Sequence, residues 1–284
     1  MFRMSQKLLI TLLFLLSPGF LSSMELKLIG SIETGPEGIH LNNPTSIYIS
    51  NDSKIYVTDT GNHRFISYSH NLKPLKQFNA AGMVKIPAGM VKDSNGNIWY
   101  IERATNSIVF INLKDKKIIK KSLNLFPGRI SIYKNKLVVL DRLSGKIIII
   151  NRKFHIVKKI FPEISDFKGF FDLKVKGNRI CGMENLTGRI FCFNMINGKQ
   201  NSIILSKKMT QPVSFDIDDN GNIFILDRYL KKVLIFNSNG RFLSSILKEG
   251  ERPGELYYPW QILIKNKRIY IVDEGNGRVD VFKF

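Results

Sequence analysis

The chain has 284 residues and a formal net charge of +20, with 43 Lys and Arg residues against 23 Asp and Glu. Turn signals such as Asn-Gly recur, and no long stretch spaces its apolar residues at the helical period of 3.6. Because no Ser- or Pro-rich linker and no low-complexity segment divides the chain, the composition argues against a helical or disordered protein and favours one β domain.

The first 23 residues are predicted to be a cleaved secretory signal. Two basic residues precede an apolar run over 8–16, a Pro-Gly pair follows at 18–19, and two small Ser residues stand at 22–23. The run is shorter than the roughly 20 apolar residues that span a bilayer, so cleavage is favoured over an uncleaved N-terminal anchor. We therefore expect an exported mature chain, residues 24–284, in the periplasm or outside the cell.

A five-residue spacing recurs six times along the remaining chain. An acid is followed five positions later by a cation, or once by Ser: Asp59 and Arg64, Glu102 and Ser107, Asp141 and Lys146, Glu184 and Arg189, Asp227 and Lys232, and Asp273 and Arg278. Fourteen or fifteen residues before each acid stands a second marker: Pro44, Pro87, Pro127, Gly169, Pro212 and Pro259. A period near 43 residues with four strands in each unit is typical of a β-propeller blade.

The predicted blades lie near residues 43–78, 86–122, 127–161, 169–205, 212–247 and 259–284. The last blade ends at Phe284 after its third strand, whereas an extra strand, 25–33, precedes the first blade. Pairing of these two segments would remove two exposed sheet edges at once. We therefore expect an all-β, six-bladed propeller of four-stranded antiparallel blades, closed by the N-terminal strand.

Two of the units resemble NHL repeats: "NPTSIYISNDSKIYVTDTGNHRFISYS" (43–69) and "PVSFDIDDNGNIFILDRYLKKVLIFNSNGRFL" (212–243). The resemblance covers about residues 25–284 and is clear in blades 1, 2, 5 and 6. It is weak in blades 3 and 4, where Gly169 replaces the proline. The family resemblance implies a six-bladed β-propeller.

The six repeated acids are predicted to be structural. A carboxylate at the end of the second strand can accept N–H groups of the turn, and it lies opposite the cation that starts the third strand. A single active site would not need six copies. Recruitment of one copy for binding is the alternative.

Cys181 and Cys192 are the only cysteines, and the predicted register of blade 4 places them opposite each other. An exported chain with an even number of cysteines favours a disulfide between them. The alternative is a pair of buried free thiols that pack as small apolar groups.

The residue after each acid is expected to point to the face on which propellers bind ligands. These residues are Thr60, Arg103, Arg142, Asn185, Arg228 and Glu274. Arg129, Tyr257, Tyr258, Trp260 and Gln261 are expected near the same channel mouth. Arginine with aromatic residues is typical of binding hot spots, and the Arg fork suits carboxylates and phosphates. The alternative is that each Arg pairs with a carboxylate of a neighbouring blade.

Lysines concentrate in predicted outer strands such as "LKDKKIIKK" (113–121) and "NRKFHIVKK" (151–159). They form either a solvated rim or a surface that attracts polyanions, including a membrane surface. The resemblance includes RNA-binding relatives, but the expected export makes nucleic acid a poor partner. We expect a monomer whose partner is a protein or an anionic polymer or glycan.

No catalytic residue, cofactor or metal site is expected. The four histidines, His40, His63, His70 and His155, fall in separate loops and strands, whereas zinc needs three or four converging ligands. The leading hypothesis is a non-catalytic binding propeller. The alternative is a divergent propeller hydrolase or lyase, similar to lactonases or amidating lyases, with a metal in the channel.

Overall fold

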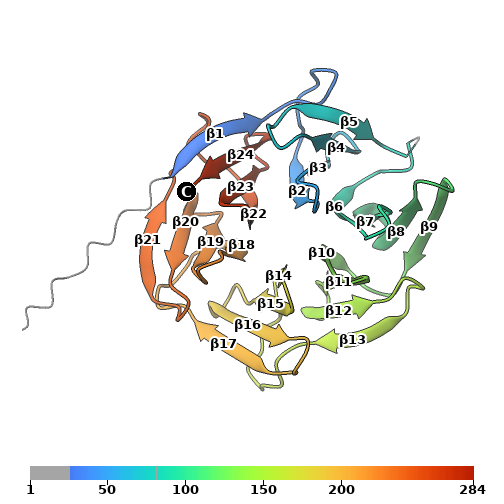
Figure 1. Ribbon diagram of the computed structural model, residues 1–284. Coiled ribbons are helices and arrows are strands. Elements are labelled where there is room, and N and C mark those ends of the chain that lie inside the picture. Colours follow the sequence, from blue (N-terminus) through green and yellow to red (C-terminus); the bar gives the residue numbers. More distant parts are fainter. Residues whose placement is uncertain (1–25, 81) are drawn as a thin grey trace, which may run out of the picture.

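The computed structural model describes residues 26–80 and 82–284, which form six four-stranded antiparallel sheets around a central channel (Figure 1). The predicted signal, residues 1–23, lies outside the described residues. Within the described residues no helix is long and apolar enough to cross a membrane. The six-bladed, all-β propeller predicted from the repeat is confirmed.

The strands run from the channel outward in each blade (Figure 1). Blade 1 holds β2 (Pro44–Ile49), β3 (Ile55–Asp59), β4 (Arg64–Tyr68) and β5 (Pro74–Phe78). Blade 2 holds β6 (Pro87–Lys92), β7 (Ile98–Glu102), the short 3-10 helix η1 (Arg103–Thr105), β8 (Ser107–Asn112) and β9 (Lys117–Ser122). Blade 3 holds β10 (Pro127–Tyr133), β11 (Lys136–Asp141), β12 (Lys146–Ile150) and β13 (Ile156–Ile160).

The second half of the ring repeats the order. Blade 4 holds β14 (Asp172–Lys176), β15 (Arg179–Met183), β16 (Arg189–Asn194) and β17 (Gln200–Ile204). Blade 5 holds β18 (Pro212–Ile217), β19 (Ile223–Asp227), β20 (Lys232–Phe236) and β21 (Phe242–Ile246). Blade 6 holds β22 (Pro259–Lys265), β23 (Arg268–Asp273), β24 (Arg278–Lys283) and β1 (Lys27–Ile32).

The two middle strands of each blade are apolar along most of their length because both of their faces pack against neighbouring blades. In blade 3, the strands "KLVVLD" (β11) and "KIIII" (β12) are buried apart from their first residues. The outer strands have a solvent face and carry the lysines, as in "KIIKKS" (β9) and "IVKKI" (β13). In blade 3, burial is therefore greatest in the two middle strands and least in the outer strand.

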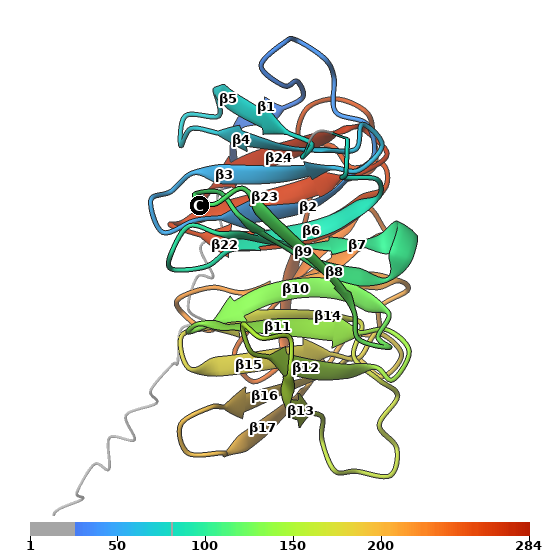
Figure 2. The same cartoon turned by 90° about the vertical axis from the view of Figure 1, so that its right-hand side faces the viewer.

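The N-terminal strand closes the ring. β1 pairs antiparallel with β24, with Lys27 opposite Lys283 and Ile32 opposite Val279 (Figures 1 and 2). Ile32 joins the apolar core that blades 6 and 1 share. The predicted closure by residues 25–33 is confirmed, and it leaves the last blade with a full set of four strands.

The six repeated acids are buried, and each one accepts backbone N–H groups from the loop that leads into its own blade. Asp59 accepts from Asn42 N at 2.7 Å, and Asp227 accepts from Thr210 N at 2.7 Å. Asp227 also accepts from two N–H groups in its own turn. Each acid therefore fastens the start of its blade to the turn between the second and third strands, in agreement with the structural interpretation.

The cations opposite these acids have less uniform roles. Direct ion pairs form between Arg64 and Asp59 and between Arg189 and Glu184, each with 2.7 Å between Nε and the carboxylate oxygen. Blade 2 has Ser107 at this position, and in blades 3, 5 and 6 the register is as predicted but, among the described residues, no ion pair joins the cation to its acid. Lys146 lies over the ring of Phe161, 3.8 Å from its centroid. The backbone N–H groups, rather than the cation, are therefore the common partners of the six acids.

Cys181 and Cys192 lie opposite each other on β15 and β16 and form a disulfide. Their Cα atoms are 4.0 Å apart, and both side chains belong to the core between blades 4 and 5. The predicted pairing is confirmed. The disulfide joins adjacent strands within one blade.

Several polar side chains hydrogen-bond across the boundaries between neighbouring blades. The innermost strands of adjacent blades belong to separate sheets, so they do not pair with one another there. Asp172 accepts from Phe215 N at 3.1 Å, and Asp216 accepts from Ile264 N at 2.7 Å. Gln261 Oε1 accepts from Ile47 N at 2.9 Å. Inner-strand N–H groups that would otherwise be buried without partners are thus satisfied by the preceding blade.

Candidate ligand-binding mouth

One face of the ring contains the turns between the second and third strands together with the loops that lead into each blade. We call it the mouth face. The helix η1 marks it at the right of Figure 2, while the turns between the first and second strands form the opposite face at the left. The residue after each repeated acid lies in a mouth-face turn, as predicted from the repeat.

Arg129 crosses the channel just below the mouth. Its side chain starts on β10 in blade 3, and its Nε lies 3.1 Å from Asp172 Oδ1 in blade 4. Its Nη2 donates to the carbonyl oxygens of Val213 at 3.3 Å and Trp260 at 2.9 Å. One buried guanidinium therefore contacts blades 4, 5 and 6.

Three arginines surround the indole of Trp260. The guanidinium carbons of Arg129, Arg142 and Arg228 lie 5.1, 5.8 and 5.0 Å from the ring centroid. Phe171 packs edge-on against the same indole, with 6.5 Å between the ring centroids. Cations within about 6 Å of an indole face are attracted to it, so these contacts hold the arginines at one place.

Two of the four predicted arginines have carboxylate partners from the next blade. Arg129 pairs with Asp172, and Arg228 Nη2 lies 3.1 Å from Glu274 Oε2. Arg103 and Arg142 make no ion pair within the described part of the chain. The alternative that each arginine pairs with a neighbouring blade thus holds for Arg129 and Arg228. Arg103 and Arg142 contribute positive charge that no carboxylate in ion-pair contact balances.

Burial and the neighbouring charges change the pKa values of two of these arginines, Arg129 and Arg142. Burial, and to a smaller extent repulsion from Arg103, lowers the pKa of Arg129, although the nearby Asp172 opposes the shift. Desolvation among the mouth side chains lowers the pKa of Arg142 to about 10, with further contributions from Arg129 and Arg103. Arg142 therefore keeps its positive charge near neutral pH. An anion placed beside these arginines would relieve the repulsion.

Four polar nitrogen atoms at the mouth are buried without a hydrogen-bond partner. One of them, Arg129 Nε, is in ion-pair contact with Asp172, and the other three are Arg103 Nη2, Arg129 Nη1 and Trp260 Nε1. A buried donor without an acceptor costs about 1–3 kcal/mol, and more when it is charged. All three belong to side chains that surround or form the Trp260 site, so an acceptor bound there could satisfy them.

Gly128 makes room for Arg142. A Cβ atom at Gly128 would lie 2.3 Å from Arg142 Nε and 2.6 Å from its Cγ, closer than two such atoms can approach. The Arg142 side chain therefore lies directly over the backbone of Gly128. The small residue beside Pro127 is part of the site, although the sequence patterns did not identify it.

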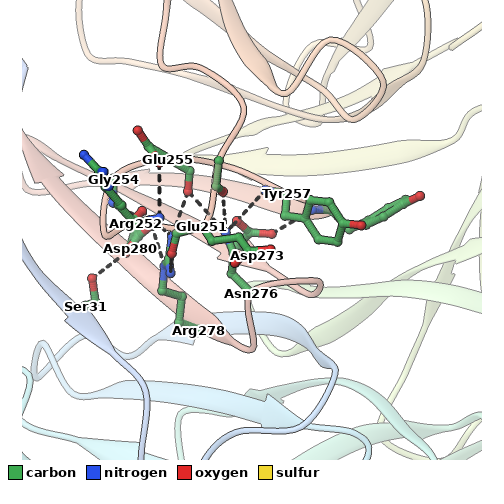
Figure 3. Close-up of polar contacts among 12 residues, drawn as sticks. Ser31, Glu251, Arg252, Gly254, Glu255, Tyr257, Asp273, Asn276, Arg278 and Asp280 are labelled. Atoms are coloured by element: carbon green, nitrogen blue, oxygen red, sulfur yellow. Dashed lines mark hydrogen bonds and ion pairs between the residues drawn. The ribbon is translucent and has the colours of Figure 1, made fainter.

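The aromatic residues before the last blade are half exposed. The backbone N–H groups of Tyr257 and Tyr258 both donate to Asp273 at 3.0 Å, and the ring of Tyr258 lies 4.9 Å from the Arg228 guanidinium. Figure 3 shows how Asn276 and Arg278 hold the preceding loop beside Asp273. The repeated acid of blade 6 thus positions two aromatic rings at the mouth.

Gln261 lies deeper than the other predicted residues. Its side-chain oxygen accepts the hydrogen bond from Ile47 N that joins blades 6 and 1. Its side chain also borders a channel cavity of about 490 Å³ that reaches the opposite face. Thr60 bonds to the carbonyl of Pro87 at 2.7 Å. The structure therefore gathers Arg103, Arg129, Arg142, Arg228, Tyr258 and Trp260 at one place and gives Gln261 a different position.

The described residues contain no group of three or more His, Cys, Asp or Glu side chains arranged to hold a metal ion. The four histidines lie apart, and His63 Nδ1 contacts the carbonyl oxygen of Lys85. The chemistry available at the mouth is therefore that of hydrogen-bond donors, positive charge and aromatic faces. Such a set can bind and orient an anionic group.

Comparisons with known proteins agree with this architecture. A family model described as an NHL repeat matches residues 41–65, and one described as a 6-bladed beta-propeller matches residues 210–284. No curated protein matches the sequence significantly. The chain is a six-bladed β-propeller, and its residues 41–65 are similar to an NHL repeat.

Solved structures with the same fold have diverse activities. A catalytically inactive virginiamycin B lyase from Staphylococcus aureus, crystallised with quinupristin, is 16% identical with a TM-score of 0.62, over 85% of this chain and 80% of that chain. A gluconolactonase from Xanthomonas campestris is 10% identical with a TM-score of 0.63, over 91% and 89%. BamB from Moraxella catarrhalis is 12% identical with a TM-score of 0.54, over 92% and 100%. At these identities the likeness concerns the fold alone.

Proposed function

We propose that this propeller is a non-catalytic binding protein whose mouth recognises an anionic group on its ligand. The observation that carries the proposal is the excess of unpaired positive charge and of buried donors around Trp260. Arg103 and Arg142 have no carboxylate in ion-pair contact among the described residues, and Arg103, Arg129 and Trp260 each have a buried donor without an acceptor.

Recognition would use long-range and short-range contributions together. A cluster of positive charge attracts oppositely charged ligands before contact. At contact, the planar forks of Arg103 and Arg142 can donate two parallel hydrogen bonds to one carboxylate or phosphate. The exposed edge of the aromatic cluster formed by Tyr258 and Trp260 would then pack against the part of the ligand that carries the anion.

The proposal includes export of a mature monomer. The motivation is the N-terminal pattern over residues 1–23, and the Cys181–Cys192 disulfide supports an oxidising compartment. N-terminal sequencing of the protein from cell envelope and medium fractions tests this part. An intact Met1 in all fractions would contradict it.

The binding proposal is tested by replacing both unpaired arginines. Poly-L-glutamate is titrated into the wild type and into Arg103→Ala/Arg142→Ala, with binding followed by intrinsic tryptophan fluorescence. We expect the double variant to bind about tenfold or more weakly at low salt, because charge-assisted hydrogen bonds are lost. The difference should shrink in about 1 M salt, where exposed charges are screened.

A matched control removes the same charge from the opposite face. Arg179→Ala/Arg241→Ala changes two exposed arginines on that face, one at the start of β15 and one in the turn between β20 and β21. This variant should bind poly-L-glutamate nearly as well as the wild type. Equal weakening in the two double variants would show that net charge, rather than the mouth, is responsible, and would overturn the proposal.

A further inference from the structure

We infer that the ligand of the mouth is a polypeptide segment that carries a carboxylate beside aliphatic or aromatic side chains. The inference rests on the proposed anion-binding function and adds the chemical class of the ligand. It rests on a second observation, which is independent of the arginines: exposed apolar side chains gather on the mouth face.

Three consecutive blades present a large apolar residue at the same turn position, two residues after the repeated acid. Leu143, Leu186 and Tyr229 are 72%, 78% and 64% exposed, and we call this set the apolar crescent. The equivalent positions in blades 1, 2 and 6 are Gly61, Ala104 and Gly275. The turn itself therefore does not require a large apolar residue, and burial in the described chain does not account for the crescent.

Further exposed apolar groups lie in the lead-in loops of the mouth face. Phe126 and Tyr258 are 48% and 45% exposed, and each directly precedes the first strand of its blade. The Phe126 carbonyl accepts from Arg142 N at 2.8 Å, and the Tyr258 carbonyl accepts from Glu274 N at 3.1 Å. Apolar side chains thus lie immediately next to the cationic centre.

The opposite face differs. Among the described residues its turns contain two exposed large apolar side chains, Leu113 and Ile196, in blades 2 and 4. The mouth face contains the crescent, Phe126, Tyr257 and Tyr258, together with several aliphatic residues of the lead-in loops. Scattered exposed apolar residues are ordinary on protein surfaces, whereas a gathering on one face around a charged centre indicates an interaction surface.

The unpaired arginines and the apolar crescent together favour some classes of ligand over others. A purely apolar partner would bury Arg103 and Arg142 without a counter-charge, which is costly. A carboxylated glycan would satisfy the arginines and stack on the tyrosines, but it would offer little apolar surface to Leu143 and Leu186. A peptide can place a carboxylate at the centre and its aliphatic or aromatic neighbours on the crescent.

Selection of short random peptides displayed on phage against the immobilised wild type tests the inference. We expect enriched sequences to contain Asp, Glu or a free C-terminal carboxylate close to aliphatic or aromatic residues. The tightest selected peptide is then synthesised with a fluorophore, and its affinity for purified variants is measured by fluorescence anisotropy. Circular dichroism and thermal midpoints verify that each variant is folded.

The central variant is Leu143→Ser/Leu186→Ser/Tyr229→Ser. It should weaken binding of the peptide about tenfold or more at every salt concentration, because apolar contact is not screened. The matched control, Leu113→Ser/Ile196→Ser on the opposite face, should change the affinity by less than about twofold. Arg103→Ala/Arg142→Ala should weaken peptide binding mainly at low salt.

The outcomes distinguish the peptide inference from the proposed anion binding. If the arginine variant weakens both the peptide and poly-L-glutamate while the crescent variant matches its control, anion binding stands and the peptide inference is wrong. If neither variant has an effect, both are wrong. Vesicles containing phosphatidylglycerol and polygalacturonate serve as further probes. Crescent-dependent binding to vesicles without peptide binding, or tight polygalacturonate binding that ignores the crescent, would also overturn the inference.

Discussion

Asp280, near the C-terminus, accepts a hydrogen bond from the hydroxyl of Ser31, 249 positions earlier in the chain. The same carboxylate lies 3.0 Å from Arg278 Nε and accepts from Gly254 N at 3.1 Å (Figure 3). Asp280 thus joins β1, β24 and the loop before blade 6. Ring closure depends on this buried carboxylate as well as on the strand pairing.

Replacing Asp280 should therefore destabilise the whole ring. Asp280→Ala leaves the buried Arg278 without its charge partner, and breaking such a pair typically costs about 3–5 kcal/mol. Ser31→Ala should cost about 1 kcal/mol, the usual contribution of one hydrogen bond. Urea unfolding followed by circular dichroism measures both. Asp52→Ala, which removes an exposed carboxylate with its contacts to Ser50 and Lys54, is the control and should shift the midpoint much less than Asp280→Ala does. A similar midpoint for Asp280→Ala would show that closure does not depend on this carboxylate.

The disulfide should stabilise blade 4 moderately. It closes a loop with a sequence separation of 11, for which the chain-entropy model gives about 2–3 kcal/mol. Cys181→Ala/Cys192→Ala should lose about this free energy of unfolding. Thiol titration of the denatured, unreduced wild type should find no free thiol. Two thiols per chain would mean that the cysteines are reduced in the isolated protein.

Gly128 should affect ligand binding only through the position of the Arg142 side chain. Gly128→Ala places a methyl group where Arg142 lies, so the arginine has to turn away from Trp260. We expect poly-L-glutamate affinity to fall about as much as in Arg142→Ala, with little loss of stability. In the double variant the two losses should not add, because both substitutions remove the same contact. Additive losses would indicate that Gly128 acts independently.

Asp172 should make stability sensitive to acid. Burial acts to raise its pKa, but Lys174, Arg129 and hydrogen bonds from Ser214 and Phe215 N together lower it below the ordinary value of 3.8. The folded state therefore favours the carboxylate. Its contribution to stability is present above the unfolded-state pKa and decreases as pH falls through the folded-state pKa.

The free energy of unfolding should therefore fall as the pH decreases below about 4, and less steeply in Asp172→Asn. Asp115→Asn, at an exposed turn position, is the control and should keep the wild-type slope. Urea unfolding at several pH values measures the slopes. An equal slope in wild type and Asp172→Asn would exclude Asp172 as an important acid-sensitive group.

The blade order, the closure and the disulfide could be predicted because they follow from spacing. The recurrence of acids such as Asp59 and Asp273 at a nearly constant period defines the strand register. That register also places Cys181 opposite Cys192 and points Arg103, Arg142 and Arg228 to one face. These inferences need only the direction of side chains along a strand.

Contacts across the channel could not be obtained in this way. The path of Arg129 to the carbonyl of Trp260 depends on a side-chain conformation and on the channel width, neither of which leaves a periodic signal. Asp172 and Asp216 did leave a signal, since polar and apolar residues alternate along "DLKVK" (β14) and in the second half of "PVSFDI" (β18). That alternation indicates a polar channel-facing side, but it does not identify the backbone N–H group that each carboxylate binds.

The position of β1 has a consequence for the order of folding. Its partner strand, β24, ends at Lys283, so blades 1 to 5 and the rest of blade 6 must be synthesised before β1 can pair. Blades 1 to 5 consist of strands that are consecutive in the sequence and can form as each is completed. Until β24 exists, the nascent ring has one unpaired strand at the start of the chain and one incomplete blade at the end. Native-like protection of β1 should therefore arise last, together with the final contacts of blade 6.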